Sequence, residues 1–210
     1  MPVVLVANPK GGVGKSTLAT NIAGYFARQG HRVMLGDTDR QQSSRHWLAL
    51  RPANAPVIDA WDIDANDVAR PPRGTTHVVL DTPAGLHGDR LKEVLKLADH
   101  VVIPLQPSMF DILATRDFLA ELAERKQVRE GRANVGVVGM RVDARTRSAE
   151  QLERYVETVG LPVLGMLRDT QNYVQLAAHG LTLFDIAPSR VAKDLEQWEP
   201  LARWLDAATA

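Results

Sequence analysis

The segment from Asn8 to Thr17, NPKGGVGKST, constrains this chain more than any other feature. It follows an apolar run at residues 3–7 and precedes apolar positions with a 3.6-residue spacing, so it occupies a strand-to-helix turn. Glycines in such a turn let backbone N–H groups point at a polyphosphate, while a lysine charge lies near the β and γ phosphates. We therefore expect a nucleotide-binding loop formed by Gly11, Gly12, Val13, Gly14, Lys15, Ser16 and Thr17.

Composition limits the class of protein. The 210 residues are 45% hydrophobic, which is enough for one large α/β domain over residues 1–210. The 25 basic and 25 acidic residues balance, so contact with nucleic acid or membrane would need a local patch. The absence of cysteine excludes disulfides, thiolate metal sites and iron–sulfur clusters. No run reaches the ~18 apolar residues of a membrane span and no signal peptide is visible, so we expect a cytoplasmic protein.

The hydrophobic pattern alternates between strands and helices. Strands are expected at residues 3–7, 31–36, 57–60, 76–80, 101–105, 134–140 and 161–167. Helices are expected from Ser16, from a cap at Ser43 or Ser44 to before Pro52, at residues 62–70, around residues 91–97, from Ser108 or Asp111 to Lys126, from a capping box at Ser148, at residues 171–178 and at residues 189–207. Such alternation predicts a doubly wound, mostly parallel sheet with helices on both faces.

Two departures from the standard phosphate-loop pattern are informative. Pro9 stands where the first glycine belongs, and Lys10 precedes the glycine pair. With these features, KGGVGKST resembles the deviant Walker A loop of the ParA/MinD family of partition and positioning ATPases. Residues 37–41, DTDRQ, look like the family's D-x-D-P-Q element with Arg40 in place of proline, and residues 78–83, VVLDTP, resemble its Walker B strand.

Phosphoryl transfer to water needs an anchored triphosphate, a metal, a positioned water and a cation. Lys15 and the loop amides are the expected phosphate anchors, with ATP and Mg²⁺ as cofactors. Ser16 is expected to ligate the metal, and Asp81, at the end of a hydrophobic strand, to hold metal-bound water. Asp39 is expected to orient the attacking water. Asp37 is a candidate for the metal's surroundings, although an aspartate after a strand is also a common helix cap.

The resemblance also implies a nucleotide-dependent homodimer. In the family, the residue matching Lys10 reaches across to the partner's phosphates, like an arginine finger supplied in trans. The loop at residues 104–111 would lie beside the nucleotide and at the dimer face. Its two prolines predict a stiff rim loop outside the central sheet. Positional analogy makes Met140, Arg141 and Pro188 candidates for contact with the base.

Two surfaces bear on the cellular role. An apolar stripe near the C-terminus lacks the lysine-rich flank of membrane-lying helices, so we expect it to pack in the core; it comprises Trp198, Leu201, Trp204 and Leu205. Basic residues are scattered among acids at Arg116, Arg125, Lys126, Arg129, Arg132, Arg145, Arg147, Arg168, Arg190 and Lys193. Arg190 and Lys193 are the leading candidates for nonspecific DNA contacts. No added helix-turn-helix region is visible, which argues against operator binding.

These observations favour a small ParA-type ATPase that dimerises with ATP, binds DNA nonspecifically at the nucleoid and is released when a partner stimulates hydrolysis. The cargo, whether plasmid, chromosome region or protein assembly, is left open. A second hypothesis is a P-loop metabolic enzyme that transfers phosphate to a small molecule. A third hypothesis is a nucleotide-gated scaffold that scarcely hydrolyses ATP, and the presence of Arg40 in place of proline leaves this hypothesis open.

Overall fold

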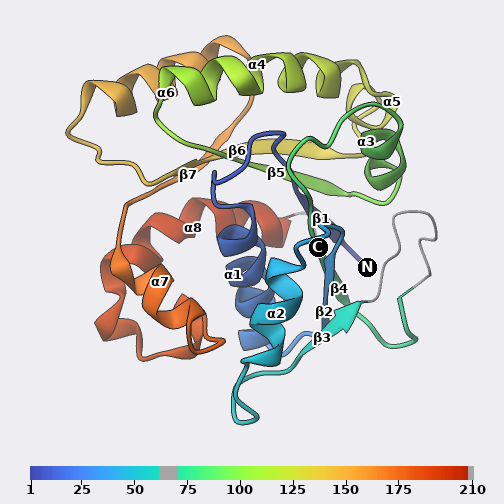
Figure 1. Cartoon of the computed structure of the whole chain (residues 1–210), viewed down its shortest axis with the longest axis vertical. Helices are drawn as coiled ribbons and strands as arrows, with labels where there is room; N and C mark the ends of the chain where they lie inside the picture. The colour runs from blue at the N-terminus through green and yellow to red at the C-terminus, as the bar shows by residue number, and fades with distance from the viewer. Residues whose placement is uncertain (62–70, 208–210) are drawn as a thin grey trace.

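A parallel sheet organises the computed structural model, which describes residues 1–61 and 71–207. Its strands are β1 (Val3–Val6), β2 (Val33–Asp37), β3 (Ile58–Trp61), β4 (His77–Asp81), β5 (His100–Leu105), β6 (Asn134–Met140) and β7 (Val163–Leu167). In the described residues they form one seven-stranded sheet with the order β3-β2-β4-β1-β5-β6-β7, and all pairings are parallel. Figure 1 shows this sheet between two layers of helices.

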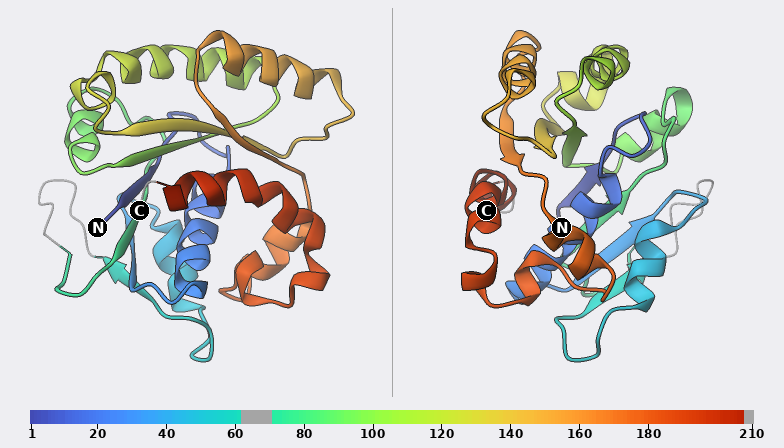
Figure 2. Two further views of the ribbon diagram at one scale, coloured as in Figure 1. Left: turned by 180° about the vertical axis from the view of Figure 1, so that it is seen from behind. Right: turned by 60° about the vertical axis from the view of Figure 1, so that its left-hand side comes forward.

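Helices cover both faces of the sheet, as Figure 2 shows in two further views. They are α1 (Lys15–Arg28), α2 (Ser43–Ala49), α3 (Gly88–Leu95), α4 (Met109–Glu124), α5 (Lys126–Arg129), α6 (Arg147–Thr158), α7 (Gln171–Ala177) and α8 (Ala192–Ala207), with 3₁₀ turns η1 (Leu183–Asp185) and η2 (Pro188–Arg190). Helices α3, α4 and α6 pack on one face, and α1, α2 and α8 on the other.

Strand β1 shows why the sheet is buried on both sides. Val3 and Leu5 belong to the core under α3, α4 and α6, whereas Val4 and Val6 belong to the core under α1 and α8. Side chains alternate along a strand, so a strand covered on both faces must be apolar throughout. The expected doubly wound α/β fold is therefore confirmed.

Several predicted element ends were wrong, while the predicted helix at residues 62–70 lies outside the described residues. Helix α6 is capped by Thr146, whose hydroxyl oxygen accepts a bond from the N–H of Ala149, so Ser148 already lies inside the helix. The expected single helix to residue 126 divides at Arg125, whose extended backbone separates α4 from α5. The last helix begins at Ala192, after the separate turn η2.

Pro104 lies inside a central strand, which corrects the predicted rim loop at its first residue. Strand β1 pairs with β5 only as far as Val102, whose carbonyl accepts a bond from the N–H of Ala7. By Pro104, strand β1 has already left the sheet. The side-chain amide of Asn8 bonds the Pro104 carbonyl at 2.8 Å instead. The missing N–H of proline therefore removes no ladder bond.

The apolar stripe in α8 packs in the core as predicted. Trp198, Leu201 and Leu205 are at most 1% exposed, and Trp204 packs against the same cluster. The indole N–H of Trp198 also donates a 2.8 Å hydrogen bond to the hydroxyl of Tyr173, which ties α8 to α7. Across residues 1–61 and 71–207, none of the helices has the length and apolar character needed to cross a membrane.

Candidate functional site

The carboxyl ends of β1, β2 and β4 meet at a polar cavity of about 460 Å³. Ligands bind at this edge of open α/β sheets, because the loops that leave neighbouring strands surround one crevice. The cavity is lined by Gly11, Gly12, Gly14, Lys15, Ser16, Thr17, Asp39, Gln41, Ser43, Thr82, Pro83, Ala84 and Arg141. The structure therefore brings together the phosphate loop and Asp39, which are separated in the sequence.

The loop between β1 and α1 adopts a backbone that needs glycine at two positions. Gly12 and Gly14 have φ angles of +77° and +98°. A Cβ on Gly14 would also lie 2.8 Å from the Cε of Met140, so the base of the loop packs directly on β6. With Val13 buried at 1% exposure, the loop is anchored below while its glycines border the cavity.

Lys15 is held inside the loop. Its ammonium donates a 2.8 Å hydrogen bond to the carbonyl oxygen of Lys10, and the residue is 8% exposed. Burial lowers the pKa of Lys15, while the charges of Asp81 and Asp39 oppose that change. A phosphate entering the cavity would offer this lysine a full negative charge in place of a carbonyl dipole.

Asp81 ends β4 as a buried carboxylate. The hydroxyl of Ser44 donates to its Oδ2, whereas Oδ1 accepts no hydrogen bond from the described residues. Burial raises the pKa of Asp81 to about 6, against the opposing effects of the Ser44 and Ser16 hydroxyls. A buried oxygen without a donor suits a hard cation, because Mg²⁺ prefers carboxylate and hydroxyl ligands. Asp81 and Ser16 therefore fit the magnesium site that the sequence suggests.

Asp37 caps helix α2 across the loop. Its Oδ2 accepts from the backbone N–H of Ser44 at 2.8 Å, and its Oδ1 accepts from the N–H of Asp39 at 2.9 Å. The prediction that Ser43 or Ser44 caps the helix was wrong: the N-cap position is Gln42, in a left-handed conformation without a side-chain cap bond. The capping role considered for Asp37 is present in this structure.

Asp39 lies at the wall of the cavity. It is half-buried, and its Oδ1 accepts a 3.0 Å bond from the N–H of Gln41, while its Oδ2 accepts no hydrogen bond from the described part of the chain. Arg40, in the position where the related element has proline, is exposed and does not line the cavity. The presence of arginine in place of proline at position 40 therefore does not change the wall of the cavity.

Sequence reasoning missed the side chains that hold the loop in place. Asn8 is fully buried: its amide group donates to the Pro104 carbonyl and to the Thr115 hydroxyl, and its Oδ1 accepts from the N–H of Lys10 at 2.8 Å. The Gln106 amide donates to the Gly12 carbonyl at 3.1 Å. The polar residue Asn8 directly after a buried strand was the available signal, but its partners lie about a hundred residues away.

The remaining candidates divide between the site and the surface. Arg141 lines the cavity and has a φ of +54°, an uncommon backbone for a residue with a side chain. Met140 is buried beneath Gly14. Pro188 is exposed in η2 and is absent from the cavity lining. Lys10 lies at the rim, where its ammonium pairs with Asp111 at 2.7 Å.

Most of the basic residues considered for DNA contact are engaged with acids. The ion pairs are Arg116–Asp117, Arg125–Glu121, Lys126–Glu130, Arg132–Glu130, Arg145–Asp143 and Arg168–Asp194. Arg190 and Lys193, like Arg129 and Arg147, are exposed and form no ion pair within residues 1–61 and 71–207. These side chains therefore keep their charge available to a ligand.

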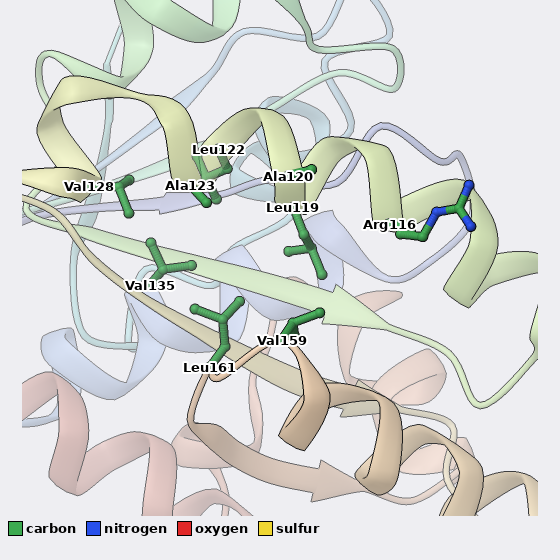
Figure 3. Close-up of a pocket in the computed structure, with 9 residues that line it drawn as sticks. All are labelled: Arg116, Leu119, Ala120, Leu122, Ala123, Val128, Val135, Val159 and Leu161. Carbon is green, nitrogen blue, oxygen red and sulfur yellow. The ribbon is translucent and has the colours of Figure 1, made fainter.

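A second cavity differs in character. It has a volume of about 260 Å³. Figure 3 shows that its lining consists of aliphatic side chains from α4, α5, β6 and the connection between α6 and β7, with Arg116 at one end. Leu119, Val135 and Leu161 are typical of its walls. It offers no cluster of polar groups for phosphate or metal, so the polar cavity is the candidate functional site.

A parallel α/β sheet, a glycine-rich loop between β1 and α1, and acidic residues at the ends of β2 and β4 define a P-loop nucleotide-binding protein. The model of the CobQ/CobB/MinD/ParA nucleotide binding domain matches residues 4–183. This chain belongs to that family, whose members include ParA and MinD ATPases, and the predicted resemblance is confirmed.

Individual relatives extend the comparison. Maintenance of carboxysome distribution protein A of Gloeobacter kilaueensis is 31% identical over 185 residues, covering 86% of this chain and 83% of the relative. The chromosome-partitioning ATPase Soj of Thermus thermophilus is 29% identical over 187 residues, covering 71% and 73%. The structure of a Cyanothece McdA variant in complex with ATP matches the fold with a TM-score of 0.74 at 16% identity, covering 99% of this chain and 96% of that one.

Proposed function

We propose that this protein is an ATPase that dimerises with ATP and positions or partitions a DNA or protein cargo. The observation that carries the proposal is the cavity itself, which the glycine-rich loop and Asp39 line together, while the charges of Asp39 and of the buried Asp81 both act on Lys15. The relatives support the same proposal, because one is a maintenance of carboxysome distribution protein and another is a chromosome-partitioning ATPase.

Five polar residues of the site have a role in the proposed hydrolysis. Lys15 and the loop amides hold the β and γ phosphates, and bound Mg²⁺, held by Ser16 and through water by Asp81, would neutralise charge on those phosphates. Asp37 fixes the start of α2 and so holds Asp39 and Ser44 in place. Asp39 accepts a hydrogen bond from the attacking water and orients it toward the γ phosphate.

A second copy of this chain is the proposed partner at the rim. Met109, Phe110 and Leu113, in the first turns of α4, are 53%, 80% and 47% exposed. Lys10 lies beside them through its pair with Asp111. Apolar side chains exposed next to a phosphate site support an interface that forms when ATP is bound, with Lys10 reaching the partner's phosphates.

DNA is the proposed surface to which the ATP-bound dimer binds. Arg190 and Lys193 are exposed and without acidic partners in the described part of the chain, and a dimer would carry two copies of each. Nonspecific duplex binding needs only a few phosphate contacts, so this surface would tether the ATP dimer to the nucleoid. A cargo protein that stimulates hydrolysis would then release it.

The test uses Asp39→Ala, which should bind ATP and dimerise without turning it over. Light scattering should show a dimer with ATP and a monomer with ADP, and duplex DNA should bind only with ATP and weaken steeply with salt. Arg190→Glu combined with Lys193→Glu should lose DNA binding while ATP turnover stays normal. Normal turnover by Asp39→Ala, or turnover that depends on a small phosphate acceptor, would overturn the proposal in favour of another P-loop reaction.

A further inference from the structure

The ion pair between Lys10 and Asp111 joins an exposed side chain to a buried one. The Lys10 side chain is 36% exposed, whereas that of Asp111 is 5% exposed, and their charged atoms are 2.7 Å apart. The second oxygen of Asp111, Oδ1, is buried and has no hydrogen-bond partner among residues 1–61 and 71–207. Lys10 is therefore the cation on which this buried carboxylate depends.

The backbone on both sides of the pair is fixed. The N–H of Lys10 bonds to Asn8, whose amide is anchored on β5 and α4, and the N–H of Gly85 bonds to the carbonyl of Pro9 at 2.7 Å. Asp111 lies in the first turn of α4, where the helix dipole favours a negative charge. Movement of Lys10 away from Asp111 must therefore occur in the lysine side chain.

From these contacts we infer that Asp111 is a positioning residue, which holds Lys10 within its own subunit and sets the ATP concentration at which two subunits join. The inference rests on the proposed function, in which Lys10 acts on the partner's phosphates. A lysine paired in cis is unavailable in trans, and a buried Asp111 left without its cation opposes the exchange. Only the attraction of a partner's triphosphate outweighs that opposition, so ADP leaves the pair closed.

The surroundings of the pair agree with this competition. Met109, Phe110 and Leu113 surround Asp111 in sequence on α4 and are the exposed apolar residues of this helix start. A second copy bound to these residues would cover Lys10 and exclude water from both anions that compete for it, the carboxylate of Asp111 and the partner's triphosphate. Only subunits whose Lys10 has left Asp111 can assemble. The apparent affinity of the dimer is therefore the intrinsic affinity multiplied by the fraction of such subunits.

The experiment measures the ATP concentration for half-maximal dimerisation by analytical ultracentrifugation, in an Asp39→Ala background that stops turnover. Asp111→Asn keeps the shape of the side chain and removes its charge, so it should lower that concentration about tenfold, as loss of a close charge pair does. Asp111→Glu should restore the wild-type value. Asp117→Asn is the matched control, because Asp117 lies on the same helix in a surface pair and is 84% exposed.

A double variant shows whether Asp111 acts through Lys10. When Lys10→Ala is present, adding Asp111→Asn should no longer change the ATP dependence. An unchanged midpoint for Asp111→Asn alone, or the same gain with and without Lys10, overturns the inference while the dimer model stands. If the Asp39→Ala protein forms no dimer at any ATP concentration, the proposed function itself fails.

A measurement on the wild-type chain covers the outcome in which Asp111→Asn does not fold. Acetylation by acetic anhydride, followed by mass spectrometry, should modify Lys10 several-fold more slowly than the exposed Lys193 in ATP-free protein. Raising the salt concentration should narrow the difference as the pair is screened. Equal rates at low salt would show that Lys10 is not held and would overturn the inference.

Discussion

Replacement of Arg51 by alanine should destabilise the chain more than any surface ion-pair variant. Arg51 donates two 2.9 Å bonds to the carboxylate of Asp185, one to the carbonyl of Gly180 at 3.1 Å and one to that of Pro56 at 2.9 Å. The side chains of Arg51 and Asp185 are 6% and 2% exposed. Removing one partner of a buried pair costs about 3–5 kcal/mol, since the other charge stays buried. Among the described residues, Thr182 would still donate to Asp185, from its backbone N–H and from its hydroxyl.

That loss is a large part of a typical unfolding free energy of about 5–15 kcal/mol. For a chain of this size it should lower the melting temperature by about 6–20 °C, at about 2–4 °C per kcal/mol. Urea unfolding followed by circular dichroism measures the change in the free energy of unfolding, and thermal unfolding measures the change in melting temperature. Arg116→Ala is the control, because its pair with Asp117 is exposed and should contribute less than about 1 kcal/mol. A loss below about 1 kcal/mol for Arg51→Ala would refute the reasoning.

Three further outcomes are expected. Burial lowers the pKa of His77 to about 4, so the stability present above pH 6.5 should fall by about 2–3 kcal/mol as the pH drops toward 4. His77→Phe should remove this part of the pH dependence in urea titrations. An equal slope of stability against pH in the variant and the wild type would contradict this expectation. Gly24→Ala would place a Cβ against the side chain of Thr182 and should lower the free energy of unfolding by about 1–3 kcal/mol, measured as a lower urea midpoint. An unchanged midpoint would show that Thr182 and η1 can move aside without cost. Ser44→Ala removes the donor to buried Asp81 and should cost about 1–3 kcal/mol without ligand, a loss that a wild-type melting curve would disprove.

Much of the fold and part of the site follow from local sequence. Glycines at positions 12 and 14 specify the left-handed turns of the phosphate loop, and the apolar stripe of α8 specifies its buried face. Asp37 and Asp81 directly follow predicted strands, and the ends of parallel strands share one edge of a sheet, so their convergence could be expected. These features are predictable because each depends on residues close together in the chain.

Partners far apart in the chain were decided by the tertiary structure. The sequence predicts alternating strands and helices, but it does not say that β1 lies between β4 and β5 or that β2 lies beside β4. That order places Asn8 beside Pro104, Lys10 beside Asp111 and Ser44 beside Asp81. Hydrogen bonds and ion pairs depend on distances of about 3 Å, which only the packing of the crossovers fixes. The sequence by itself therefore determined which chemical groups are available at the site, whereas the order of the strands decided how its lysine and carboxylates are held.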